Sequence, residues 1–115
     1  MNVYIFIDNP DLGEQHDDAI ASLQACIGED NPHATLINET TNDEQDIERL
    51  GIVFTLKRSK YLHTPLADLY KIALKYKCDF VVGIVEGDVY EDVCYFGNEE
   101  GKPDAYEIGC YLGLK

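Results

Sequence analysis

The chain has no tryptophan, a single methionine and only nine lysine and arginine residues, against 22 aspartate and glutamate residues, among 115. The formal net charge is therefore -13 at pH 7. A body this acidic repels nucleic-acid phosphates, so direct nucleic-acid binding is disfavoured. The apolar fraction of 45% and the charged fraction of 27% are those of a globular protein. They exclude a disordered chain and predict one domain over residues 1–115.

Long apolar runs and paired cysteines are also absent. No run is long enough to cross a bilayer, so we expect no membrane partner. The first residues, MNVYIFID, lack the basic start of a secretory signal. None of the cysteines forms C-x-x-C or stands at zinc-ligand spacing from a histidine; they are Cys26, Cys78, Cys94 and Cys110. These absences predict a cytoplasmic protein with reduced, mostly unreactive thiols and no cofactor.

Positive charge is concentrated in one segment. Residues 1–48 hold twelve acids and no lysine or arginine, whereas residues 49–77 hold seven basic residues and one acid. Six of the nine basic residues lie in TLKRSKYLHTPLADLYKIALKYK, residues 55–77. Three interpretations follow. The segment folds against the acidic parts of the same chain or of a homodimer partner, it binds an anion, or the acidic remainder attracts a basic partner.

Hydrophobic periodicity predicts a mixed α/β order. Strand patterns cover residues 2–8, 33–39, 51–57, 79–86 and 89–96. Helical spacing runs from Leu12 to Ile27 and from Thr64 to Tyr76. In the second helix, Thr64 would be the N-cap and Pro65 the first helical residue. The acidic segment 40–50 fits a short helix or a loop, and residues 104–114 fit a helix or a strand. We take the helix in both places.

This order predicts an α+β fold with a ferredoxin-like split β-α-β core, followed by an extra strand and a short helix. Its sheet would be antiparallel, with both long helices on one face. The alternative is a small three-layer α/β fold with a largely parallel sheet. The segment 40–50 distinguishes the two, because a crossover helix allows parallel strands whereas a loop makes a hairpin. At about ten residues it is short for a crossover.

Candidates for chemistry are few. The segment GNEEGK, residues 97–102, lacks the spacing of a phosphate-binding loop and is followed by Pro103. Acids close three of the predicted strands: Asp8, Glu39 and Glu86. In a parallel sheet they would meet at one edge, where carboxylates bind Mg²⁺ for phosphoryl transfer. An antiparallel sheet would send Glu86 to the opposite edge. The simpler interpretation of all three acids is that they lie in turns and helix caps.

Tyrosine is the abundant aromatic residue, with eight copies. Tyrosine is favoured at protein interfaces, although half-buried positions at core edges are the simpler explanation. We therefore predict a small binding or regulatory protein with no catalytic motif, whose partner is another protein, a basic one or a second copy. The alternative is a metal-dependent or small-molecule-binding enzyme that uses the strand-end acids. The predicted interaction surface comprises Tyr90, Tyr95, Tyr106, Lys57, Arg58 and Lys60.

Overall fold

The computed structural model describes residues 2–8, 15–29, 34–40, 48–55, 62–87 and 89–113. Within these ranges the side chains of residues 16, 26–29, 38–40, 48 and 49 are not described. The strands are β1 (Asn2–Asp8), β2 (Thr35–Thr40), β3 (Glu48–Thr55), β4 (Asp79–Glu86) and β5 (Val89–Gly97). The helices are α1 (His16–Glu29), α2 (His63–Tyr76) and α3 (Ala105–Leu112).

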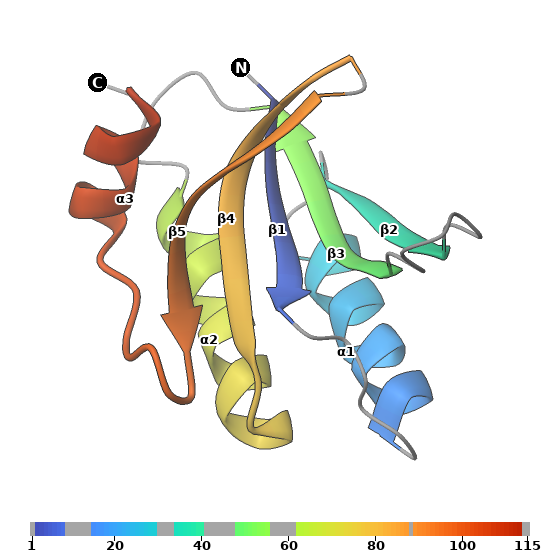
Figure 1. Ribbon diagram of the computed structural model, residues 1–115. Helices are drawn as coiled ribbons and strands as arrows, with labels where there is room; N and C mark the ends of the chain where they lie inside the picture. Colours follow the sequence, from blue (N-terminus) through green and yellow to red (C-terminus); the bar gives the residue numbers. More distant parts are fainter. Residues whose placement is uncertain are drawn as a thin grey trace.

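The strands form one five-stranded sheet in the order β2-β3-β1-β4-β5 (Figure 1). Every neighbouring pair is antiparallel. The alternative with a largely parallel sheet is therefore wrong, and the α+β class is confirmed. The reason lies between β2 and β3, where residues 41–47 are too few for the crossover that parallel neighbours require. The predicted helix over segment 40–50 is wrong at its two ends, because Thr40 belongs to β2 and residues 48–50 belong to β3. Residues 41–47 lie outside the described part of the chain, so the choice between helix and loop stays open for them.

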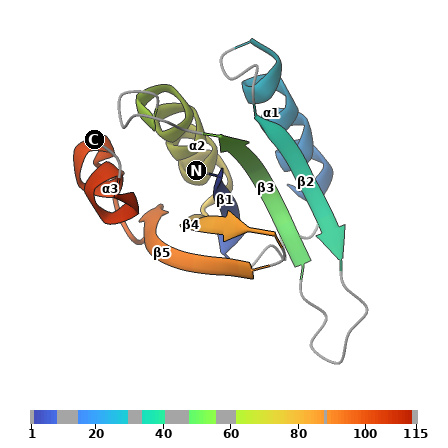
Figure 2. The same ribbon diagram turned by 90° about the horizontal axis from the view of Figure 1, so that it is seen from above.

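Helices α1 and α2 lie on one face of the sheet, and α3 lies beside them next to β5 (Figure 2). A large hydrophobic core fills the space between these helices and the sheet. Ser22 of α1 and Tyr76 of α2 join the two long helices through a hydrogen bond of 3.0 Å between their hydroxyl oxygens. Residues 105–112 are helical, as predicted, because the carboxylate of Asp104 accepts hydrogen bonds from the N–H groups of Tyr106 and Glu107.

The start of α2 differs from the prediction. Leu62 occupies the N-cap position and makes no side-chain cap hydrogen bond, and Thr64 and Pro65 lie inside the first turn. Proline is tolerated there because the first N–H groups of a helix have no acceptor within it. Leu62 is itself fully buried, so packing of its side chain explains a start that the capping rule does not.

Helix α2 is the main support of the core. Leu69 and Ala73 are completely buried one turn apart, whereas Leu74 on the same helix is 47% exposed. We expect Leu69→Ala to lower the free energy of unfolding by about 2–5 kcal/mol, because it removes buried contacts and leaves a cavity. The matched change Leu74→Ala should cost less than about 1 kcal/mol. Urea unfolding of both variants measures the difference, and equal losses would contradict the assignment of the buried face.

Candidate functional site: the sheet face opposite the helices

The central strand β1 is buried on both sides, yet in the described part of the chain the helices cover only one. Its residues alternate, with Val3, Ile5 and Ile7 in the large core and Tyr4 and Phe6 in a second cluster on the opposite face. Tyr4 is only 1% exposed and Phe6 only 6%. Figure 2 shows α1 and α2 on the other side of the sheet, so a different element must cover these two rings.

The covering residue is Tyr90, at the start of β5. Its ring centroid lies 5.4 Å from that of Tyr4 and 6.0 Å from that of Phe6, and those two rings stack at 4.8 Å. Strand β5 reaches this position because it bends across the sheet (Figure 1). The bend coincides with a β-bulge opposite Val82 and Gly83, where Val93 is the extra residue. Bulges increase local twist, so the bulge accounts for the curl of β5 over its neighbours.

A hydrogen bond fastens the central strand to this curled edge. The phenol of Tyr4 donates to a carboxylate oxygen of Asp92 on β5. The tyrosine ring lies across Gly83, where a Cβ atom would come within 2.2 Å of the phenol oxygen. Burial, reinforced by the hydrogen bond to Asp92 and its charge, raises the pKa of Tyr4 well above its usual range. The phenol therefore stays neutral and keeps donating at physiological pH.

Carboxylates border the exposed part of the same face. Tyr95, 47% exposed, follows Asp92 along β5 beyond the bulge. The negative charge of Asp92, together with that of Asp8 and Glu100, raises the pKa of Tyr95. Asp8 continues the alternation of Tyr4 and Phe6 along β1. We call this surface the tyrosine face: Tyr4, Phe6, Asp8, Tyr90, Asp92 and Tyr95. It presents aromatic rings within a negative electrostatic field.

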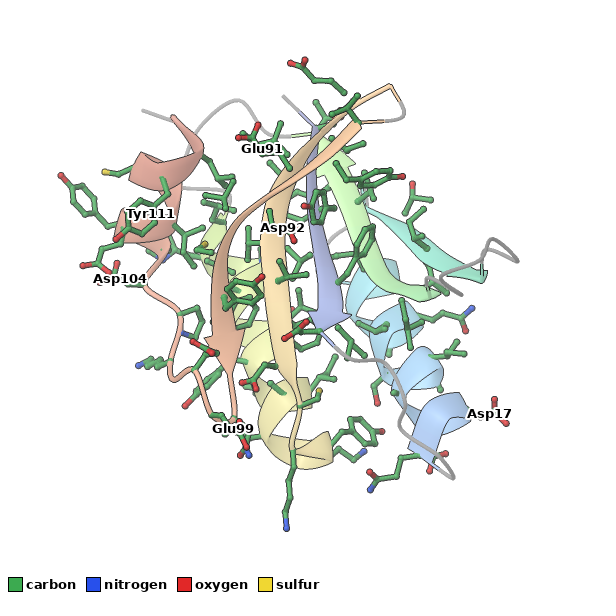
Figure 3. The ribbon with its side chains drawn as sticks, viewed as in Figure 1. Asp17, Glu91, Asp92, Glu99, Asp104 and Tyr111 are labelled. Atoms are coloured by element: carbon green, nitrogen blue, oxygen red, sulfur yellow. The ribbon has the colours of Figure 1, made fainter. Side chains whose placement is uncertain are left out.

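Two of the predicted interaction residues, Tyr90 and Tyr95, lie on the tyrosine face. Tyr106 does not, since it lies on α3 and is 76% exposed. Tyr111 is also exposed on α3, at the far edge of the molecule in Figure 3. The predicted basic residues Lys57, Arg58 and Lys60 lie outside the described part of the chain. The structure thus brings two tyrosines of the predicted set together and places the third elsewhere.

The strand-end acids proposed as metal ligands lie at different places in the sheet. Asp8 is in register with Asp79 at one end of β4, whereas Glu86 closes the opposite end of that strand. Glu39 pairs in register with Arg49, and the side chains of both are outside the described set. Among the described residues, no three histidine, cysteine, aspartate or glutamate residues are grouped so that they could hold a metal ion.

Sequence reasoning missed Tyr4, Phe6 and Asp92. The alternation in NVYIFID already places Tyr4 and Phe6 on the same side of a strand. That alternation was used only to predict a strand over residues 2–8. Asp92 could not be found in this way, because its position over Tyr4 depends on the bulge at Val93.

Comparison of the chain with protein-family models, with curated proteins and with solved structures finds no match. In the part of the chain that the structure describes, no helix combines the length and the apolar character needed to cross a membrane. The interpretation of the site therefore depends on its geometry and charge.

The thiols should differ in reactivity. Cys78 is buried and Cys94 half-buried, and burial raises the pKa of each to about 11, with the charge of Asp79 adding to the effect at Cys78. Cys110 is exposed, which departs from the expectation of mostly unreactive thiols. Iodoacetamide at pH 8 should label Cys110 at least about tenfold faster than the other two, because the thiolate is the nucleophile. Peptide mass mapping over time measures the rates, and equally rapid labelling of Cys78 would contradict its burial.

The Tyr4 phenol should make stability depend on pH in alkaline solution. Its pKa is higher in the folded protein than in the unfolded chain, so unfolding releases a proton above about pH 10. The contribution is complete below that pH and declines as the pH rises further. In urea melts, Tyr4→Phe should lose about 1 kcal/mol at pH 8 and then show a shallower decline from pH 9.5 to pH 11 than the wild type. The exposed control Tyr106→Phe should keep the wild-type decline. Identical declines in Tyr4→Phe and the wild type would contradict the role of Tyr4.

Proposed function

We propose that this protein is a cytoplasmic, non-enzymatic binding protein that docks a basic segment of another protein on its tyrosine face. The observation that supports this most directly is a sheet face that no described helix covers, on which exposed Tyr95 lies near Asp92 and Asp8. Aromatic rings are favoured at the centres of interfaces. Carboxylates beside them select the sign of the partner's charge.

The overall charge supports the same choice of partner. A net charge of -13 attracts cationic proteins over distances of about 8 Å in physiological salt. It repels nucleic acid and other copies of the same chain, so a homodimer would need local complementarity from the basic segment 55–77. Arginine and lysine can also interact favourably with the faces of tyrosine rings. An enzyme that uses Asp8, Glu39 and Glu86 receives no comparable support, because Glu86 closes the end of β4 opposite the Asp79–Asp8 pair.

We further propose that β1–β4 with α1 and α2 form a ferredoxin-like split β-α-β arrangement. Its support is the strand order β2-β3-β1-β4, in which each long helix connects two strands that have one strand between them. In this view β5 and α3 are additions at one edge, and β5 carries the functional tyrosines. The proposed fold does not itself indicate a function, since one architecture hosts many activities.

Binding of a labelled cationic peptide tests the proposed function. The probe is an acetylated, amidated octapeptide of alternating arginine and threonine, and its counterpart has glutamate in place of arginine. Fluorescence anisotropy should detect binding of the arginine probe alone, weakening as salt is raised. Asp92→Asn should weaken binding about 3- to 10-fold, because asparagine can still accept from Tyr4 but lacks the charge. Tyr95→Ala should weaken binding by removing an exposed ring.

Matched variants control for nonspecific attraction. Asp17 on α1 and Tyr111 on α3 are exposed and lie away from Asp92 (Figure 3). Asp17→Asn and Tyr111→Ala should bind the arginine probe as the wild type does. If Asp17→Asn weakens binding as much as Asp92→Asn, the attraction belongs to the net charge and the tyrosine face is not the site.

A further inference from the structure

The outer side of the helix layer is a second uncovered surface in the described part of the chain. Helices α1 and α2 lie side by side on the sheet, and Figure 2 shows no labelled helix or strand on their outer side. On α2, Leu74 is 47% exposed, and Lys71 and Lys75 are exposed beside it. On α1, Ala21 and Ala25 are exposed one turn apart. The surface therefore presents a half-exposed leucine on one helix and small side chains on the other.

Opposite charges lie at the same end of this surface, on different helices. Asp17 and Asp18 are in the first turn of α1, and both are exposed. Lys71 and Lys75 are in the last two turns of α2. The colours in Figure 1 show that α1 begins at the end of the helix layer where α2 finishes. At that end the surface is thus negative on α1 and positive on α2.

A twofold axis parallel to the helices would bring these opposite charges together. Rotation about an axis placed over the surface, between α1 and α2, lays α1 of a second copy on α2 of the first and keeps each helix end at its own height. The acidic start of α1 in one copy then faces Lys71 and Lys75 of the other, and the contact occurs twice. An axis across the helices would instead lay α1 on α1 and separate the acids from the lysines. The charges therefore select the first arrangement.

Repulsion between two copies is also weak at this surface. Helices α1 and α2 together hold four acids and two lysines, whereas the whole chain has a net charge of -13. In physiological salt, exposed charges more than about 8 Å apart are largely screened from each other. The acids on the sheet side therefore add little repulsion to a contact between helix layers. Both lysines belong to the basic segment 55–77, which thus supplies the local complementarity that a homodimer needs.

We propose that this protein forms a homodimer through the outer faces of α1 and α2, with Lys71 and Lys75 of each copy facing Asp17 and Asp18 of the other. Exposed ion pairs contribute little energy each, so they fix the orientation, and apolar contact of Leu74 with the facing α1 adds affinity. Two short helices per copy make a small contact, and interfaces below about 1,200 Å² are commonly weak. We therefore expect a dissociation constant of about 10–100 µM. Dilute protein is then monomeric, so the urea melts of Leu74→Ala report on the monomer.

Such a dimer would carry its two sheets on the outside. Each tyrosine face lies on the side of the sheet opposite the helices, so the two faces would point away from each other (Figure 2). One consequence depends on the proposed function: the dimer would then hold two basic segments at once. Binding at each single face is unchanged by the dimer, so Asp17→Asn stays a valid control for peptide binding.

Charge reversal with rescue tests the dimer on the protein alone. One variant carries Lys71→Glu and Lys75→Glu, and the other carries Asp17→Lys and Asp18→Lys. Each variant brings like charges together in its own homodimer, so each should sediment as a monomer at concentrations where the wild type is a dimer. In an equal mixture, both helix contacts of a mixed dimer regain opposite charges. Sedimentation equilibrium should then detect a mixed dimer at least about tenfold tighter than either homodimer.

Control variants separate this contact from a general effect of charge. Lys102→Glu and Glu107→Lys change exposed residues just before α3 and within it, and they should dimerise as the wild type does. Circular dichroism checks that each variant is folded. For a reversal that does not fold, glutamine in place of the lysines, or asparagine in place of the aspartates, should weaken the dimer about 3- to 10-fold.

Three results would overturn the proposed dimer. The first is a wild type that stays monomeric at about 1 mM. The second is a mixture of the two charge-reversed variants that forms no more dimer than the separate variants do. The third is an equal loss of dimer in the α3 controls, which would assign association to net charge. Because no peptide is present, these results leave the proposed binding at the tyrosine face to its own test.

Discussion

The fold depends on burying β1 on both of its faces. Five consecutive residues of this strand are buried, and the helices supply cover for only one side in the described part of the chain. The second side is closed by β5, whose bulge at Val93 turns its first half across the sheet. Tyr90 then covers Tyr4 and Phe6, and Asp92 holds the Tyr4 phenol. The interaction between Tyr4 and Asp92 therefore links the centre of the sheet to its edge.

This arrangement places polar groups at the border of a small apolar cluster. Asp92 accepts a hydrogen bond from a buried phenol and remains exposed on its other side, so its charge still acts on the surface. The same residue that stabilises the curl of β5 thus contributes negative charge to the tyrosine face. Under the proposed function, one carboxylate serves both stability and recognition. The variant Asp92→Asn is informative because it keeps the hydrogen-bond acceptor and removes the charge.

The basic residues that the structure describes have local roles. Lys75 lies with its ammonium nitrogen 5.2 Å from the centre of the Tyr76 ring, a favourable cation–π distance. Lys77 ends α2 in the left-handed conformation, at φ 54°, where its N–H donates to the carbonyl of Ala73. Cations near a helix C-terminus also complement the helix dipole. Two of the six basic residues in segment 55–77 therefore have a local role at the end of one helix.

The sequence by itself determined the strands and helices, the α+β class and the buried face of α2. It did so because alternation and helical spacing report locally which side of an element faces the core. Charge and tyrosine content also pointed to Tyr90 and Tyr95. Only the tertiary structure decided that Tyr4, Phe6 and Asp92 join them and that Tyr106 lies elsewhere, and it selected, of the two sheets considered, the antiparallel one that separates Glu86 from Asp8. The physical reason is that one extra residue at Val93 redirects β5, and strand direction sets which ends meet. Neither effect is local, so neither can be derived from the spacing of residues along the chain.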